Sequence, residues 1–440
     1  MESIWKSSGL FGLQLSVMAA ILGFTGPSSF LRPAALAIVV LCPYLQLPEL
    51  EGIKHPVLRA FIGAACVYTV VLYTDAALIH KWSFDVHGPT SSAGGLKPER
   101  SKVTKLSKNA SKEPRSLPNV IRRFGFGFEV SLQSRFPTTK WPVKTIPPFS
   151  RTNPEFVPER AVFILTELAR VIFCLLFLVF LDLLPKNADE NLVIFSSQRI
   201  PFFRRGNSLT LNEIIVRSAS VLVYWTSQYI IIQAVYSTLA AITVALGMTP
   251  VQSWPPVFGF ISDSYSIRQF WGSFYHQLLR RGCGGIAHFL TCTCLGLSKR
   301  GIWSRYIYTC AVFMVSGLFH AFSDVAQGIP WSESGALQFF MLQVFGIMLE
   351  DAFGALLRLR TSSDWDPAQR SFSTSRRPFK ALGYLWTLAW LVWSTPVWIY
   401  PSLQRSTGVA IIPISGYFQW ALITGSQTLA GPSELALLCS

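Results

Sequence analysis

The sequence predicts an all-α membrane protein built as a polytopic bundle of transmembrane helices. Half of its 440 residues are hydrophobic and only 14% are charged, whereas a soluble domain carries roughly 25% charged residues. Several apolar runs reach the length of about 20 residues that a helix needs to cross the hydrocarbon core. Because lipid offers no hydrogen-bond partners to the backbone, such runs fold as helices. Charged residues gather between the runs, which favours one bundle with one sizeable polar loop.

The apolar runs define about nine expected spans and one shorter segment. Ile214–Leu246 is longer than one crossing needs, so we expect it to tilt or to continue along the interface. Cys283–Leu297 is short, apolar and rich in glycine, which favours a re-entrant segment. Leu10–Gly26 has the length of a signal-peptide core, but Glu2 offsets Lys6, so we favour an uncleaved span. The expected spans are Leu10–Gly26, Leu31–Pro48, Val57–Lys81, Val162–Leu184, Ile214–Leu246, Tyr306–Phe322, Leu337–Leu357, Leu382–Tyr400 and Val409–Leu429.

A basic loop, residues 82–159, separates the N-terminal transmembrane helices in residues 1–81 from a transmembrane core in residues 160–440. The net charge is +15, and the many Lys and Arg residues of this loop place it in the cytosol by the positive-inside rule. The stretch from Thr90 to Pro118 is rich in Ser, Gly, Lys and Pro, which is typical of disorder. The N-terminus is then luminal and the C-terminus cytosolic. Asn109-Ala-Ser111 is a glycosylation sequon, and glycosylation there would invert this topology.

The charge and the cysteines exclude several classes of function. No basic face with interleaved aromatic residues forms a domain of its own, so we expect no nucleic-acid partner. Most of the eight cysteines lie within apolar runs, where they act as small buried hydrophobic residues. Cys292-Thr-Cys294 is too tight for a CxxC motif, and no His and Cys cluster has zinc spacing. We therefore expect no metal and no bound cofactor.

One histidine inside an apolar run, His320 in AVFMVSGLFHAFSD, is the candidate catalytic group. A titratable side chain at membrane depth is costly, and so it marks a functional site. A neutral imidazole can take the proton of an alcohol that attacks a thioester, which accelerates transfer by roughly 10²–10⁴-fold. The chain has no GxSxG elbow and no P-loop, which favours direct transfer without a covalent acyl-enzyme. A structural histidine bonded to a neighbouring helix is the alternative, and His288 is a weaker second candidate.

A second stretch, Ser266–Arg281, reads SIRQFWGSFYHQLLRR. On a helix its aromatic residues would form one stripe and its polar residues the other face. We expect this helix to lie in the membrane interface, with the aromatic rings at headgroup depth and the basic residues toward phosphates.

These two stretches resemble the wax synthase-like branch of the membrane-bound O-acyltransferase superfamily. Plant wax synthases show S-L-x-D-F-W-G-R-R-W-N, then an apolar run that ends in S-G-x-x-H. Fungal members often carry W-H-Q where this chain has Tyr275-His276-Gln277. The chain departs from the plant pattern at Gln269, which replaces an acid, and at Ser273-Phe274, which replace a basic pair. The matching positions are Ser266, Phe270, Trp271, Gly272, Ser316, Gly317 and His320.

The resemblance implies an acyltransferase fold, with His320 as the general base and the Ser266–Arg281 stretch around the acyl donor. The candidate acyl-CoA-binding residues that it implies are Arg268, Gln269, Trp271, His276, Arg280 and Arg281. It also implies acetyl-CoA as co-substrate and a lipophilic terpenoid or meroterpenoid alcohol as acceptor, since the chain is similar to fungal acetyltransferases of secondary metabolism. A multi-pass location in the endoplasmic reticulum follows from it. A long-chain wax or sterol ester synthase is the alternative enzyme. A transporter is the non-enzyme alternative, although the sequence shows no internal repeat of the kind that transporters often carry.

Overall fold

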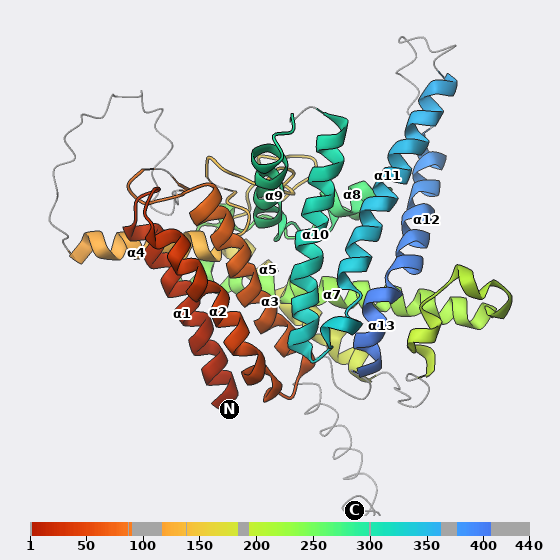
Figure 1. Ribbon diagram of the computed structural model, residues 1–440, viewed down its shortest axis with the longest axis horizontal. Coiled ribbons are helices and arrows are strands. Elements are labelled where there is room, and N and C mark those ends of the chain that lie inside the picture. Colours follow the sequence, from red (N-terminus) through yellow and green to blue (C-terminus); the bar gives the residue numbers. More distant parts are fainter. Residues whose placement is uncertain are drawn as a thin grey trace, which may run out of the picture.

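The computed structural model describes residues 2–86, 88–89, 117–137, 139–183, 193–298, 301–361 and 376–405. They fold almost entirely as helices and turns, which confirms the predicted all-α class (Figure 1). The expected span Val409–Leu429, the sequon at Asn109 and most of the stretch predicted to be disordered lie outside these residues.

Seven helices of the described residues are long and apolar enough to cross a membrane, and they match seven of the nine expected spans. Their positions follow the apolar runs because each run must form its backbone hydrogen bonds within itself. They are α1 (Glu2–Phe24), α2 (Leu31–Glu51), α3 with its π-helical end (Pro56–Tyr73, Thr74–Ile79), α5 (Arg160–Leu183), α7 (Leu211–Ala245), α10 (Ile302–Gln327) and α11 (Ala336–Thr361).

The expected span Leu382–Tyr400 is wrong as a single helix. The structure divides it into α12 (Arg376–Ser394) and α13 (Pro396–Arg405), which meet at Thr395. Pro396 explains the break, because proline lacks an N–H donor and disfavours the helical conformation of the residue before it. Neither helix is among the seven candidate spans. The break matters for the site described below, since α13 carries Trp398 into the interior.

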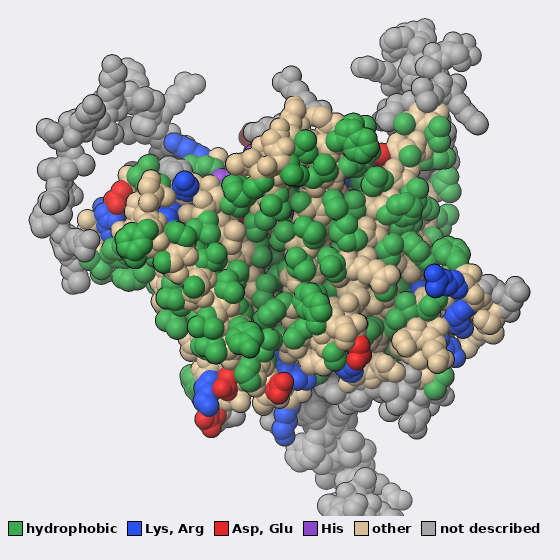
Figure 2. Space-filling model, in the orientation of Figure 1, with side chains coloured by type: hydrophobic (Ala, Val, Ile, Leu, Met, Phe, Trp, Pro, Cys, Tyr) green, Lys and Arg blue, Asp and Glu red, His purple; other side chains and the backbone are tan. Residues whose placement is uncertain are grey.

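The helices form a bundle that one long helix crosses. In Figure 1, α1, α2 and α3 lie together, α10 stands beside α11, and α7 runs behind them at a steep angle. α7 has 35 residues, which is more than one upright span needs, and it uses this length to cross the bundle. Figure 2 shows hydrophobic side chains over the middle of one face, with charged side chains mainly at its margins. This is the surface of an integral membrane protein.

The polar loop contributes a helix, α4 (Leu117–Leu132), that packs against α1. Gly127 permits the close contact, because a Cβ atom there would lie 2.2 Å from the carbonyl oxygen of Ala19. Arg123, one turn earlier on α4, donates to the carbonyl of Gly23 over 2.8 Å and pairs with Asp85 over 2.6 Å. The loop is therefore anchored on the N-terminal helices rather than free of them.

The Ser266–Arg281 stretch does not form the expected amphipathic helix at the interface. It begins with the three residues of α8 (Ile267–Gln269) and continues as a π-helix (Phe270–Phe274). The backbone then extends at Tyr275, with ψ of 154°, before the next helix, α9 (Arg280–His288), which continues as a π-helix to Cys294. Phe270 and Tyr275 are buried in the bundle instead of lying at headgroup depth.

A carboxylate from another helix explains this shape. Glu350 on α11 accepts the backbone N–H groups of Ile267 over 2.6 Å and of Arg268 over 3.2 Å, so it caps α8. Trp386 of α12 donates to the same carboxylate over 3.1 Å. The π-turn closes where the N–H of Tyr275 donates to the carbonyl of Phe270 over 2.7 Å. These bonds fix an inward turn that helical periodicity does not reveal.

Candidate active site

A cavity of about 1110 Å³ lies between α3, α7, α10, α11, α13 and the segment from Arg268 to Gly284. On α10 its lining extends from Tyr308 to Gln327, which at 1.5 Å per residue is roughly 28 Å, about the thickness of the hydrocarbon core. A pocket for one small ligand measures about 300–1,000 Å³. This cavity exceeds that range, so it has room for more than one small ligand.

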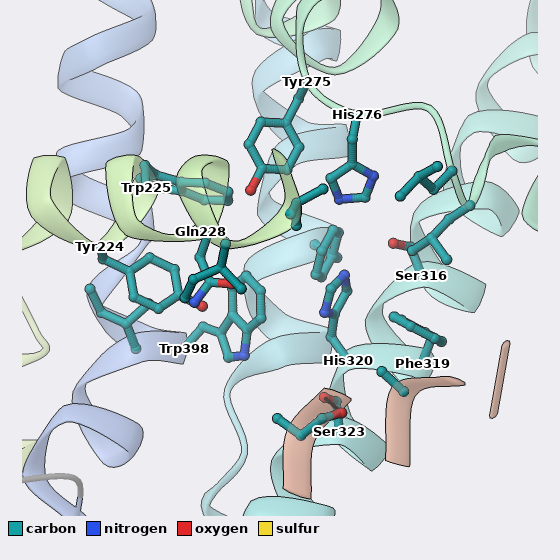
Figure 3. Close-up of a pocket in the computed structure, with 18 of the residues that line it drawn as sticks. Tyr224, Trp225, Gln228, Tyr275, His276, Ser316, Phe319, His320, Ser323 and Trp398 are labelled. Atoms are coloured by element: carbon teal, nitrogen blue, oxygen red, sulfur yellow. Dashed lines mark hydrogen bonds between the residues drawn. The ribbon is translucent and has the colours of Figure 1, made fainter. Parts of the chain in front are cut away.

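His320 on α10 faces the cavity near its middle (Figure 3). Its imidazole stacks on Phe340 with a centroid distance of 4.8 Å and an interplanar angle of 9°, and Trp398 packs against it at 4.9 Å. Gly317 lets α11 come this close, since a Cβ atom there would lie 3.0 Å from Leu337 and 3.3 Å from Phe340. Within the described residues no side chain or carbonyl hydrogen-bonds the imidazole, so its nitrogens face the cavity free to meet a substrate.

A second imidazole, His276, faces the same cavity from the turn after the π-helix (Figure 3). Its Nδ1 atom is buried and has no hydrogen-bond partner in the described part of the chain. Burial and the nearby charge of Arg135 lower the pKa of His276 to about 4. The ring is therefore neutral at cellular pH, with one nitrogen that donates and one that accepts.

Arg135 ties the polar loop to this side of the cavity. It is buried, and its guanidinium donates to the carbonyl oxygens of Pro255 and Pro256, each over 2.6 Å. Arg135 also bonds the hydroxyl of Tyr236 on α7. The loop thus packs against the segment that leads into α8 and supplies the positive charge near His276.

Four of the six candidate donor-binding residues line the cavity: Arg268, Trp271, His276 and Arg280. Arg268 pairs with Asp351 over 2.6 Å, yet two fifths of its side chain stays exposed. Arg280 donates to the carbonyl of Gly272 over 2.6 Å and to the hydroxyl of Thr145 over 2.7 Å. The structure brings these cationic groups to one end of the cavity, on the side of the polar loop.

The other two candidates, Gln269 and Arg281, do not line the cavity. Gln269 accepts a hydrogen bond from Ser273 over 3.0 Å within the π-helix. Arg281 points to the N-terminal helices, where it binds buried Asp75 over 2.8 Å and lies over the ring of Trp82. Two adjacent arginines, at positions 280 and 281, therefore have different surroundings.

The structure adds cavity residues that sequence reasoning missed. Trp398 of α13 donates to Asp324 over 3.1 Å, and Ser334 donates to the same carboxylate over 2.6 Å. Asp324 thereby holds the indole that packs on His320. Tyr224 and Gln228 of α7 line the opposite wall. A polar residue in the middle of an apolar run was the signal available for Gln228.

Known proteins with similar sequences point to the class of enzyme. Residues 254–342, which hold the Ser266–Arg281 stretch and His320, match the model of the membrane bound O-acyl transferase family. The chain is 42% identical to acetyltransferase fsoF of Humicola fuscoatra over 92% of its length and 98% of that protein. It is 33% identical to acetyltransferase aurG of Calcarisporium arbuscula over 89% of its length and 92% of that protein.

A third relative, acetyltransferase atnC of an Arthrinium species, is 27% identical over 91% of this chain and 88% of that protein. No solved structure matches the chain. The likeness to fsoF and aurG extends along nearly all of both proteins, and the family model covers the cavity segment that carries both histidines. This protein belongs to the membrane-bound O-acyltransferase family and is an integral membrane acyltransferase.

Proposed function

We propose that this enzyme transfers the acetyl group of acetyl-CoA to a hydroxyl of a lipophilic terpenoid or meroterpenoid alcohol, in the membrane of the endoplasmic reticulum. The observation that carries the proposal is the pair of imidazoles, His276 and His320, that face one cavity. The buried Nδ1 atom of His276 has no partner among the described residues. The names of the relatives favour acetyl over a long acyl chain.

In the proposed reaction His320 is the general base. Its neutral imidazole removes the hydroxyl proton while the alcohol oxygen attacks the thioester carbon, so that a C–O bond forms. The C–S bond then breaks, and the CoA thiolate takes the proton back from the imidazolium. His276 stabilises the negative charge on the carbonyl oxygen through its N–H. No covalent acyl-enzyme is formed, and no cofactor besides the co-substrate takes part.

The donor enters at the end of the cavity that carries Arg268 and Arg280. Cationic side chains form strong charge-assisted hydrogen bonds with phosphates such as those of CoA. This end adjoins the polar loop through Thr145 and Arg135, and the charge of that loop favours the cytosol, where CoA is. The apolar acceptor would reach the cavity from the bilayer.

Two neighbouring substitutions separate donor binding from stability. Arg280→Ala is expected to raise the KM for acetyl-CoA about tenfold, because it removes a charge-assisted contact from the cavity mouth. Arg281→Ala removes the arginine that pairs with buried Asp75 and leaves the carboxylate with the imidazole of His80 at 3.0 Å. It is expected to destabilise the protein by about 3 kcal/mol with little change in that KM. Steady-state kinetics and thermal unfolding in detergent give both quantities. A raised KM in the Arg281 variant and not in the Arg280 variant would contradict the assignment.

The protonation of His276 predicts how stability depends on pH. Its folded pKa of about 4 lies below the ordinary value of 6.5, so the unfolded chain binds the proton more readily. The stabilising contribution is complete above pH 6.5 and is lost as the pH falls through about 4. The unfolding temperature should therefore fall between pH 7 and about 5. His276→Asn should reduce this fall, since it removes the titrating group, and an unchanged fall would contradict the pKa.

The proposed function is tested with microsomes that contain the expressed protein. Labelled acetyl-CoA and a panel of lipophilic alcohols are supplied, and ester formation is followed by chromatography. Palmitoyl-CoA competes in the same assay. We expect acetyl esters, in amounts that palmitoyl-CoA lowers only weakly. Clear preference for the palmitoyl ester would favour a long-chain wax or sterol ester synthase instead.

A further inference from the structure

The wall of the cavity opposite His320 carries two polar side chains that the proposed reaction does not use. Gln228 is the central residue of α7, and Tyr224 lies one helical turn before it, so both are on one face of the helix. Both line the cavity and lie across it from His320 (Figure 3). Their position is therefore inside the helix bundle and beside the proposed reacting groups.

Neither side chain forms a hydrogen bond with any residue that the structure describes. Other polar groups on α7 have partners: Gln233 donates to Ser237 over 2.8 Å, and the indole of Trp225 donates to Thr395 over 3.1 Å. Several hydroxyl groups bond carbonyls of their own helix, namely those of Ser218, Ser220, Thr238 and Thr243. The amide of Gln228 and the hydroxyl of Tyr224 differ from these because they are directed at open space.

An uncommitted amide at membrane depth is costly. Moving an amide or hydroxyl out of water is unfavourable unless a new hydrogen bond replaces those it made to water. Polar side chains inside a membrane are thus retained where they bind something. A primary amide offers two donors and one acceptor, and a phenol offers one donor besides its acceptor oxygen. Together they suit an oxygen-containing group, either a hydroxyl or a carbonyl.

The surroundings of this polar pair are apolar and aromatic. The ring of Tyr224 contacts two indoles, that of Trp225 with a centroid distance of 5.7 Å and that of Trp398 with a centroid distance of 5.9 Å. Trp398 also packs on His320 at 4.9 Å. Between the polar pair and the base there is an aromatic surface that fits a rigid hydrocarbon skeleton. An acceptor that extends from the polar pair to His320 would place one oxygen near Gln228 and Tyr224 and another near the imidazole.

We propose that Gln228 and Tyr224 bind a second oxygen function of the acceptor and so determine which hydroxyl meets His320. This inference rests on the proposed acetyl transfer and makes its substrate class narrower. The acceptor is an alcohol with at least one further hydroxyl, ketone or ester on a rigid apolar skeleton, and not a simple fatty alcohol. Gln228 and Tyr224 are specificity-determining residues that do not touch the transferred acetyl group.

The test compares steroids that share one ring skeleton: a monohydroxy steroid and the matching dihydroxy and hydroxyketo steroids. Microsomal enzyme is supplied with acetyl-CoA, and kcat/KM is measured for each. We expect at least one doubly oxygenated steroid to exceed the monohydroxy steroid about tenfold, which is what one well-made hydrogen bond provides. Gln228→Leu and Tyr224→Phe should bring this ratio close to one, with the KM for acetyl-CoA unchanged.

Gln233→Leu is the matched control, since it makes the same change on α7 at an amide that is bonded to Ser237 and does not line the cavity. It should leave the ratio unaltered. Equal use of all the steroids by the wild type, or a ratio that survives in both cavity variants, would overturn the inference. If any steroid is acetylated by the wild type and not by the His320→Ala variant, the proposed acetyl transfer still stands. Failure of this inference can therefore be distinguished from failure of the proposed function.

Discussion

Replacing His320 with alanine is expected to lower acetyl transfer by about 10²–10⁴-fold, which is the usual contribution of a general base. The imidazole is held by ring contacts with Phe340 and Trp398. Its loss removes the proton acceptor without leaving a broken hydrogen bond, and the protein should remain folded. The amount of ester is measured by mass spectrometry, and the amount of folded protein by gel filtration in detergent. Their ratio gives the size of the effect.

His288→Ala is the control for this substitution. His288 lies at the end of α9 and does not line the cavity, so its replacement should change the rate less than about twofold. If the His320 variant kept its activity and the His288 variant lost it, the assignment of the base would be wrong. The kinetics would also separate the roles, since loss of a base lowers kcat and leaves the KM for the donor nearly constant.

Replacing His276 with alanine is expected to lower kcat by about 10²–10³-fold, as the loss of one oxyanion donor does. Replacement with asparagine should retain more activity, because the amide N–H can donate to the same carbonyl oxygen. If His276 were the base instead, both variants would lose activity to the same extent, since neither alanine nor asparagine can accept the proton. The comparison of the two variants in the same microsomal assay therefore identifies the role as well as the importance of His276.

His55 provides the control for the second prediction. Its Nδ1 atom is also buried with no hydrogen-bond partner among the described residues, but it lies at the start of α3 and does not line the cavity. His55→Ala should leave kcat within about twofold of the wild type. A loss in this variant equal to that in the His276 variants would indicate that an unpartnered imidazole affects folding and not the reaction.

Local properties of the sequence determined the class of the protein and the positions of its spans. Hydrophobic runs long enough to cross a bilayer must form helices wherever they occur, and seven expected spans are found without reference to any tertiary contact. His320 was also visible locally, because a titratable residue in an apolar run is unusual. Its role as a base stays a prediction, but the cavity around it is consistent with that prediction.

Tertiary structure alone decided the shape of the Ser266–Arg281 stretch and the contents of the cavity. The turn at Tyr275 depends on a cap from Glu350, which is far along the chain and on another helix. The sequence gives no reason to assign different roles to the adjacent residues Arg280 and Arg281. Their roles differ because Arg281 pairs with Asp75 at the end of α3, whereas Arg280 lines the cavity. Gln228 could be noticed in its apolar run, but the packing of α7 against the rest of the bundle decides that it faces His320. Helix formation is local in lipid, whereas caps, ion pairs and cavity walls join distant residues.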